Sequence, residues 1–247
     1  MTLTLLSYNI RYGGVGREKP LATVIAAHAP DLVVLQEATR PAVIEQLAGA
    51  LGMPLWGSKM GRSLGYMSRV PLARVEWRKP RWSKHAFLEL TLKEAPVAVF
   101  GVHLSAVHSN WTERRRLVEA GSLLADIRKR DRGFHVVVGD FNTLAPGEQL
   151  DLAKLPPRLR TITYLTGRRI RWQTVNLMLE ADYVDGYRLR CPEGRGYTFP
   201  TWDPHLRLDY AFVPRDHADQ LTACEVASHD HGRAASDHFG LLMRIET

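Results

Sequence analysis

The sequence predicts a globular fold that mixes helices and strands. Short apolar runs rich in Val, Ile and Leu are typical of buried strands, and amphipathic segments with helical spacing lie between several of them. Apolar residues make up 45% and charged residues 24% of the 247 residues, ordinary values for a chain with a sizeable core. No repeat or composition break marks a second domain, so residues 1–247 are expected to form one domain. Periodicity alone leaves open whether the fold is α/β or α+β.

The charge and the cysteines limit the classes of function. A net charge of +7 and a pI near 9.6 favour phosphate-rich partners, such as nucleic acid, nucleotides or anionic lipid headgroups, without selecting among them. Cys191 and Cys224 lie outside any Cys-x-x-Cys or Cys/His cluster, so a zinc–thiolate site is not expected. Two free thiols are the simpler account, although one disulfide is also allowed. Without a secretory signal or a membrane-spanning stretch, the sequence predicts a cytoplasmic protein with no stable membrane insertion.

The stretch Val136–Asn142 carries the strongest local signal. Its three β-branched residues predict a buried strand, and Gly139 allows a turn or a close approach at the strand end. Because residues two apart in extended backbone share a face, Asp140 and Asn142 are expected to face one space. A carboxylate and a carboxamide there can hold a nucleophilic water beside a phosphate. An Asx turn that caps the strand explains the same two residues equally well.

The remaining elements follow from apolar runs and helical spacing. Strands are predicted at 3–9, 32–37, 87–92, 97–103, 207–213 and 241–245. Helices are predicted at 18–29, 41–51, 112–130 (with Thr112 as its cap) and 174–180. Residues 52–85 are expected to be irregular, and residues 143–172 to form a basic loop. The tryptophans of the basic stretches, Trp56, Trp77 and Trp82, are expected to pack in the core or at its rim more readily than to stack on a base.

Polar side chains with useful chemistry recur at the ends and starts of these strands. They are Asn9, Glu37, His103, Asp140 with Asn142, Asp209, and the pair Asp237-His238. Each alone has an ordinary explanation, such as a solvated carboxylate at a strand end or a hydrogen-bonded core histidine. Together they indicate one cleft at the edges of packed sheets. Their oxygen donors suit Mg²⁺ or Mn²⁺ rather than a soft metal.

Six segments resemble the endonuclease/exonuclease/phosphatase superfamily, in the order and at the separations usual there. They are Tyr8-Asn9-Ile10-Arg11, Leu35-Gln36-Glu37, Gly101-Val102-His103-Leu104, Gly139-Asp140-Phe141-Asn142-Thr143, Arg207-Leu208-Asp209-Tyr210 and Ser236-Asp237-His238. The superfamily includes DNase I-like nucleases, abasic-site endonucleases, inositol polyphosphate 5-phosphatases and neutral sphingomyelinases. The resemblance implies a four-layer fold, with two mixed β-sheets face to face and helices outside. One departure is that only Gly65-Tyr66-Met67 precedes Ser68-Arg69-Val70-Pro71, where family members commonly have a longer apolar run.

The resemblance implies how the metal and the attacking water are held. Glu37 is expected to bind the divalent cation directly, with Asn9 and Asp237 as further ligands, directly or through water. Asp140 and Asn142 are expected to hold the water in line with the scissile bond. Asp140 is then one candidate for the base that takes the proton of this water.

The resemblance also assigns roles to the histidines. His238 is the other candidate base, or binds the phosphate as a cation, and Asp209 is expected to accept a hydrogen bond from its ring. His103 is expected to donate a hydrogen bond to the phosphate in the transition state. Sequence alone does not choose between Asp140 and His238 as the base.

The function expected from these residues is that of a metal-dependent phosphodiesterase acting on nucleic acid, a nuclease. The basic residues Arg168, Arg169 and Arg171 are expected to contact the substrate, since they follow the Asp140–Asn142 segment in a long loop. One alternative is a phosphodiesterase or phosphatase for a small substrate, such as a phospholipid headgroup, a nucleotide or an inositol phosphate. Another is a non-catalytic nucleic-acid-binding domain, which the complete set of polar residues disfavours. No protein partner is predicted.

Overall fold

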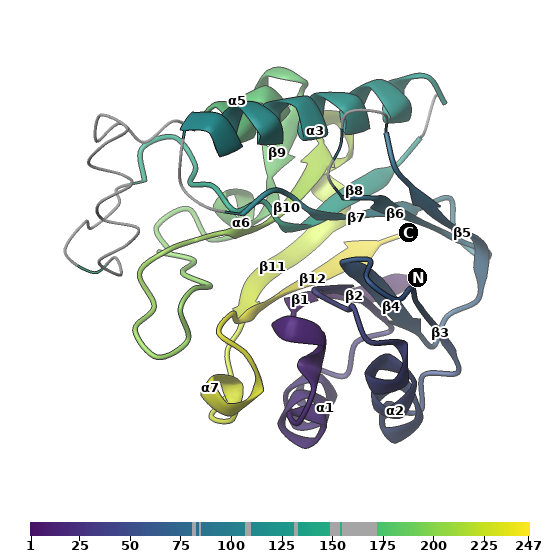
Figure 1. Ribbon diagram of the computed structural model, residues 1–247. Coiled ribbons are helices and arrows are strands. Elements are labelled where there is room, and N and C mark those ends of the chain that lie inside the picture. The colour runs from purple at the N-terminus through teal and green to yellow at the C-terminus, as the bar shows by residue number, and fades with distance from the viewer. Residues whose placement is uncertain (81–82, 84, 107–109, 131–132, 149–153, 155–171) are drawn as a thin grey trace.

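The computed structural model describes residues 1–80, 83, 85–106, 110–130, 133–148, 154 and 172–247. Within them, two six-stranded mixed sheets pack face to face, with helices on both outer faces (Figure 1). This confirms the predicted four-layer arrangement. The first sheet has the order β11 (Leu221–Ala227), β12 (Gly240–Glu246), β1 (Thr2–Asn9), β2 (Leu32–Gln36), β4 (Leu64–Ser68) and β3 (Leu55–Ser58). The second has the order β5 (Leu72–Arg78), β6 (Phe87–Leu92), β7 (Ala98–His103), β8 (His135–Asp140), β10 (Asp209–Pro214) and β9 (Tyr183–Asp185).

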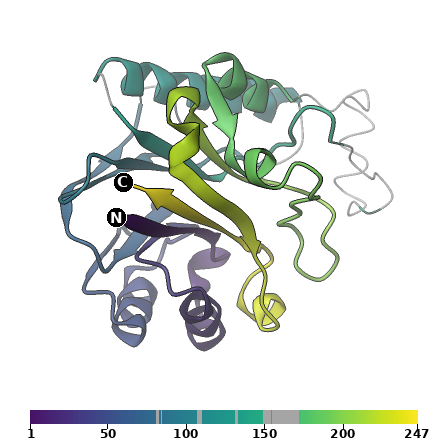
Figure 2. The same cartoon turned by 180° about the vertical axis from the view of Figure 1, so that it is seen from behind.

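The helices divide between the two outer faces. Figure 2 shows the purple and yellow-green helices below the first sheet and the teal and green helices above the second. The first group contains α1 (Glu18–Ala27), α2 (Pro41–Leu51) and α7 (Gly232–Ala235). The second group contains α3 (Asn110–Arg128) and α5 (Gln173–Glu180), while the short α6 (Gly186–Arg190) follows β9 directly.

Successive residues along a strand point to opposite faces of its sheet and so pack in different apolar cores. One core lies between the sheets, and one lies between each sheet and its helices. In β1, Leu3 and Leu5 face the space between the sheets, whereas Leu6 and Tyr8 face α1, α2 and α7. In β8, the odd-numbered Val137 packs toward α3 and α5, and its even-numbered neighbours pack between the sheets. This is the period of two expected for strands buried on both faces. β1 and β8 therefore each present one stripe to the space between the sheets and the other to the helices.

Each sheet contains one parallel pair of strands at its centre. β1 pairs in parallel with β2, and β7 pairs in parallel with β8, while the other pairs are antiparallel. A parallel pair needs a long crossover, which α1 supplies in the first sheet and α3 in the second. In each pair, the carboxyl ends of the two strands therefore lie at the same edge of the sheet.

The prediction that residues 52–85 are irregular is wrong, because β3, β4 and β5 lie there. These strands are short and two of them contain glycine, which resembles a chain breaker in sequence. The glycines are needed for packing instead. A Cβ on Gly57 would lie 2.6 Å from the Tyr66 ring, and one on Gly65 would lie 2.9 Å from the Cβ of Ala38. β11 was also not anticipated.

Three smaller predictions, on the cap of α3, the tryptophans and the cysteines, are corrected or settled by the structure. α3 begins at Asn110, so Thr112 lies inside its first turn and does not cap the helix. Trp56 and Trp77 are partly buried against the cores, and Trp77 Nε1 donates a hydrogen bond to Leu64 O at 3.0 Å. Trp82 lies outside the described residues. Both cysteines are free thiols.

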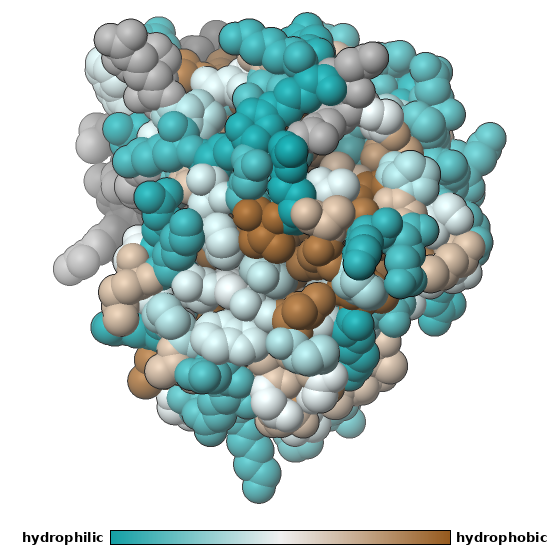
Figure 3. Space-filling view, turned by 90° about the vertical axis from the view of Figure 1, so that its right-hand side faces the viewer, coloured by the Kyte–Doolittle hydropathy of each residue, from teal (hydrophilic) through white to brown (hydrophobic). Residues whose placement is uncertain are grey.

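The side of the molecule toward which both termini lie has apolar side chains at its centre with hydrophilic ones around them (Figure 3). β1 leads away from this side, from Thr2 to Asn9. The polar strand ends therefore gather at the other end of the central strands. Among the described residues, no helix combines the length and apolar character needed to cross a bilayer.

A buried ion-pair network fixes the start of β10. Arg207 is 1% exposed, and its Nε lies 2.7 Å from Glu148 Oε1 while its Nη1 lies 2.7 Å from Asp185 Oδ2. Its guanidinium also stacks on the Tyr210 ring, 4.4 Å from the centroid. The network joins the chain after β8, the end of β9 and the residue two before Asp209. It therefore fixes the chain just before Asp209, one of the polar residues at the strand ends.

Arg207→Ala is expected to lower the free energy of unfolding by about 3–5 kcal/mol, because the buried carboxylate of Asp185 loses its counterion and Glu148 keeps only Arg188 among the described residues. The matched control is Arg215→Ala, since Arg215 pairs with Asp182 at 2.7 Å where both side chains are more than half exposed. That change is expected to cost about 0–1 kcal/mol. Urea denaturation of the two variants checks this, and equal losses would contradict the structural role of Arg207.

Candidate active site

The strand registers bring polar residues far apart in sequence to one edge of the molecule. His103 is the Cα partner of Asp140 at the carboxyl ends of β7 and β8, and Asp209 faces Asp140 at the start of antiparallel β10. In the other sheet, Asn9 ends β1 beside the end of β2. Antiparallel β12 starts at this same edge, so His238 lies just before it. The edge common to both sheets therefore collects five polar side chains.

Four of these side chains continue the stripes that form the core between the sheets. Asn9 has the parity of Leu3 and Leu5 in β1. Likewise, His103, Asp140 and Asp209 have the parity of the residues of β7, β8 and β10 that face this core. The polar groups thus occupy the last positions of an apolar layer, where it opens at the edge. Burial there strengthens electrostatic interactions among them.

Asp140 is the hub of the hydrogen bonds between the two sheets. Its Oδ2 accepts from Asn9 Nδ2 at 3.0 Å, and its Oδ1 accepts from the backbone N–H of Asn142 at 2.8 Å. The Nε2 atoms of His103 and His238 lie 3.8 and 3.9 Å from the same Oδ2. Burial raises the pKa of Asp140 to about 7. The positive charge of His238 opposes this rise, and the negative charge of Asp209 reinforces it.

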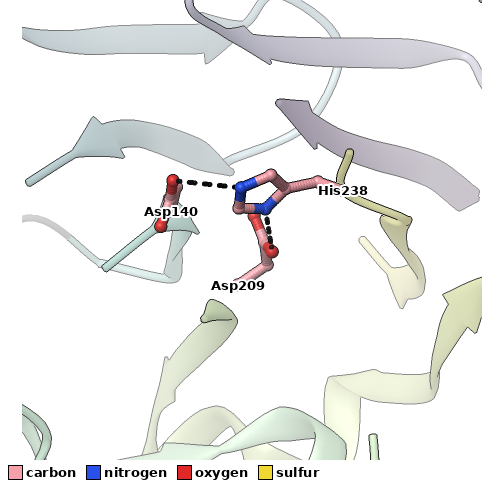
Figure 4. A group of neighbouring side chains, drawn as sticks. All are labelled: Asp140, Asp209 and His238. Carbon is pink, nitrogen blue, oxygen red and sulfur yellow. Dashed lines mark hydrogen bonds and ion pairs between the residues drawn. The ribbon is translucent and has the colours of Figure 1, made fainter. Parts of the chain in front are cut away.

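His238 lies between two carboxylates (Figure 4). Its Nδ1 lies 2.9 Å from Asp209 Oδ2, and its Nε2 points toward Asp140. Burial lowers the pKa of His238, but the charge and hydrogen bond of Asp209, together with Asp140, outweigh it and raise the pKa to about 10. The Phe199 ring, 4.8 Å from the imidazole between centroids, covers it. The ring is therefore fixed by a charged partner and an aromatic one.

Asp140, Asp209 and His238 offer ligand atoms within 4.8 Å of one another, a spacing at which three groups can share a metal ion. This set differs from the predicted ligands Glu37, Asn9 and Asp237. Its imidazole is already hydrogen-bonded to Asp209 through Nδ1, and the raised pKa favours the protonated ring. Since a metal needs a neutral imidazole, a cation here would have to displace a proton. The three groups are therefore better suited to moving protons.

Glu37 has the surroundings of a ligand for a hard cation. It follows β2 with a positive φ of 57°, which turns it out of the strand, and its oxygens accept from Asn9 Nδ2 at 3.4 Å and from the backbone N–H of Tyr12. Among the described residues, no Lys or Arg forms an ion pair with it. A half-buried carboxylate next to a carboxamide, without a cationic partner, suits Mg²⁺ or Mn²⁺.

Asp237, the third predicted ligand, is positioned by arginine. Its Oδ2 lies 3.3 Å from Arg11 Nε, and Ser236 Oγ lies 3.4 Å from its Oδ1. Ser236 Oγ also donates to Asn9 O at 2.7 Å, which ties the segment before β12 to the end of β1. Asp237 thus borders the same edge as Glu37 and Asn9, with one oxygen already paired.

Asn142 differs from the sequence expectation in its backbone. Its φ of 52° takes it out of extended conformation, and Asp140 and Asn142 form the Asx turn that the alternative interpretation described. Asn142 Nδ2 donates to Leu104 O at 3.1 Å. The side chain therefore connects the chain after β8 with the chain after β7, beside Asp140.

Sequence reasoning missed Ser63, which hydrogen-bonds His103. Ser63 Oγ contacts His103 Nδ1, which leaves Nε2 directed at Asp140. His85 stacks on the His103 ring, with centroids 5.3 Å apart and planes within 12°. No local pattern in the sequence marks Ser63, because it precedes one of the strands that was not anticipated. The predicted substrate contacts Arg168, Arg169 and Arg171 lie outside the described residues.

Comparison with known proteins gives the family. Residues 6–238 match the model of the Endonuclease/Exonuclease/phosphatase family, and no curated protein matches the sequence. An AP endonuclease from Archaeoglobus fulgidus is 17% identical, with a TM-score of 0.74 over 99% of this chain and 100% of that one. A 3′ phosphatase from Neisseria, NExo, bound to a product DNA hairpin, is 20% identical, with a TM-score of 0.71 over 99% of this chain and 100% of that one.

A third solved structure, an endonuclease/exonuclease/phosphatase from Beutenbergia cavernae DSM 12333, is 23% identical, with a TM-score of 0.72 over 99% of this chain and 71% of that one. At these identities the structural likeness shows the fold, two mixed sheets with flanking helices. The family match extends from β1 to His238 and so includes every residue of the polar edge. The chain therefore belongs to the Endonuclease/Exonuclease/phosphatase family.

Proposed function

We propose that the protein is a divalent-metal-dependent phosphodiesterase that cleaves nucleic acid. The observation that carries this proposal is the chain of contacts from Asp209 through His238 to Asp140, set beside Glu37 and Asn9 at the open edge between the sheets. It combines a proton-accepting group, a polarised imidazole and hard oxygen ligands. Phosphoryl transfer needs mainly such positioning and charge neutralisation.

The proposed roles of the active-site residues are as follows. Asp140 and His238 act as one unit that takes the proton of the attacking water, because their facing atoms are 3.9 Å apart. Asn142 and Asn9 hold Asp140 in place through its two oxygens. His103, with Nδ1 engaged by Ser63, presents Nε2 to the phosphate and stabilises its charge in the transition state.

Glu37 holds the cation, with Asn9 and Asp237 as further ligands. Bound there, Mg²⁺ or Mn²⁺ would neutralise a non-bridging phosphate oxygen and the charge of the leaving group. Arg11, which pairs with Asp237, adds positive charge at the entrance. The net charge of +7 attracts a polyanionic substrate.

The choice of nucleic acid over small phosphoesters is supported by two lines. The basic charge is one, and the other is that the solved structures of similar fold include a phosphatase bound to a DNA hairpin and an AP endonuclease. The description of NExo as a 3′ phosphatase favours a second candidate, removal of a terminal phosphate from DNA. Both reactions use the same water and the same cation.

The test is a panel of substrates assayed with Mg²⁺, with Mn²⁺ and with EDTA: plasmid DNA, a single-stranded oligonucleotide, a 3′-phosphorylated oligonucleotide and bis-p-nitrophenyl phosphate. We expect hydrolysis of at least one DNA substrate with either cation, no hydrolysis in EDTA, and only a small residual rate, measurable at high enzyme concentration, in the His238→Ala variant. Thermal unfolding with and without EDTA controls for loss of the fold. Full activity in EDTA overturns the metal dependence, and turnover of bis-p-nitrophenyl phosphate alone overturns nucleic acid as the substrate.

A further inference from the structure

Two exposed aromatic side chains border the candidate active site. Tyr12 is 75% exposed and Trp202 is 53% exposed. Single exposed aromatic residues are common on protein surfaces. These two are different because each directly follows a residue that contacts Asp237: Arg11 pairs with its carboxylate, and Thr201 donates its backbone N–H to its carbonyl.

Tyr12 is held on the side of Asp237 nearer to Glu37. Its backbone N–H donates to Glu37 Oε2, and the preceding residue, Arg11, pairs with Asp237 at 3.3 Å. The Arg11 guanidinium lies 5.4 Å from the centroid of the Tyr12 ring. The ring therefore stands exposed beside a cation that is itself next to the candidate metal ligands.

Trp202 is held on the side nearer to His238. The backbone N–H of Thr201 donates to Asp237 O at 2.9 Å, and Trp202 is the next residue. Its ring meets the Phe199 ring at 6.3 Å between centroids, and Phe199 in turn covers His238. One face of this aromatic pair thus contacts the imidazole, and its outer member is open to solvent.

We propose that Tyr12 and Trp202 stack on unpaired nucleobases that flank the scissile phosphate. This rests on the proposed function and narrows its substrate to single-stranded or frayed nucleic acid. Aromatic rings stack on any base, and their exposed faces lie one residue from groups that bind Asp237. In a duplex the bases are stacked on one another, so such rings reach only bases that are unpaired. Arg11 supplies positive charge for the backbone between the two rings.

The test compares two oligomers with the same phosphate backbone, a single-stranded oligonucleotide and one built wholly of abasic tetrahydrofuran units. Tyr12→Ala and Trp202→Ala are each expected to raise KM for the oligonucleotide about 5- to 100-fold, with kcat nearly unchanged. KM for the abasic oligomer is expected to stay the same. Trp202→Phe, which keeps an aromatic face, is expected to retain most of the affinity. Because both side chains are largely exposed, their removal should leave the melting temperature unchanged.

The matched control is Trp111→Ala. Trp111 is 78% exposed, and its ring packs with Arg114 of its own helix, 5.9 Å away. It is expected to leave KM within about twofold. An equal loss at Trp111, or an equal rise of KM for the abasic oligomer, overturns the stacking assignment. If bis-p-nitrophenyl phosphate is hydrolysed and neither oligomer is cleaved, the stacking assignment is overturned, although the protein is still a phosphoester hydrolase. Absence of all hydrolysis overturns the proposed function itself.

Discussion

Replacing Asp140 by Asn is expected to lower kcat by about 1,000-fold or more on any substrate that the protein hydrolyses. The amide has the shape of the carboxylate but cannot take a proton. It also removes the charge that faces His103 and His238 at 3.8 and 3.9 Å. Steady-state assays with saturating Mg²⁺ measure the loss. The matched control is Asp182→Asn, the same chemical change at a carboxylate that is 69% exposed.

The fold is expected to survive this substitution. Burial raises the folded-state pKa of Asp140 above its unfolded value, so at pH above the folded pKa the ionised carboxylate disfavours folding. Asn removes that cost. Its NH₂ group, however, replaces an oxygen that accepts from Asn9 or Asn142, so two hydrogen-bond donors then face each other, which offsets the gain. We expect a melting temperature within about 3 °C of the wild type. Retained activity, or a protein that no longer folds, would contradict this assignment.

The part of the site that sequence could predict is the part that follows from strand periodicity. Asn9, His103 and Asp140 each end a run of apolar residues, and each lies on the stripe that faces the other sheet. A period of two, with parallel pairing, is enough to bring such residues to one edge. The resemblance of the six segments to the superfamily predicted that two mixed sheets pack face to face, which periodicity left open.

Other features depend on contacts that no local pattern encodes. Glu37 turns out of its strand through a positive φ, and Arg207 meets Glu148 across 59 residues of sequence. Ser63 precedes a strand whose glycine reads as a breaker, although that glycine is required by the close approach of Ala38. Such side chains are specified by tertiary packing, and only the assembled sheets show what they contact.

Asp209→Asn is expected to lower kcat by about 10²- to 10⁴-fold with KM changed by less than about threefold. The amide oxygen can still accept the hydrogen bond from His238 Nδ1, now 2.9 Å from Asp209 Oδ2, so the ring keeps its place. What is lost is the negative charge that raises the pKa of His238. A readout besides rate follows, because the His238 ring should titrate at lower pH in Asp209→Asn, as measured by NMR.

The double variant Asp209→Asn/His238→Ala separates two roles for Asp209. If Asp209 acts only through His238, adding Asp209→Asn to His238→Ala lowers the residual activity no further, because the pair functions as one unit. Asp209 Oδ1 has no hydrogen-bond partner among the described residues, so a direct contact with a cation or the substrate is the competing role. In that case Asp209→Asn would lower the residual activity of His238→Ala about as strongly as it lowers that of the wild type. Residual hydrolysis at high enzyme concentration therefore distinguishes a group that positions the imidazole from one that touches the reacting atoms.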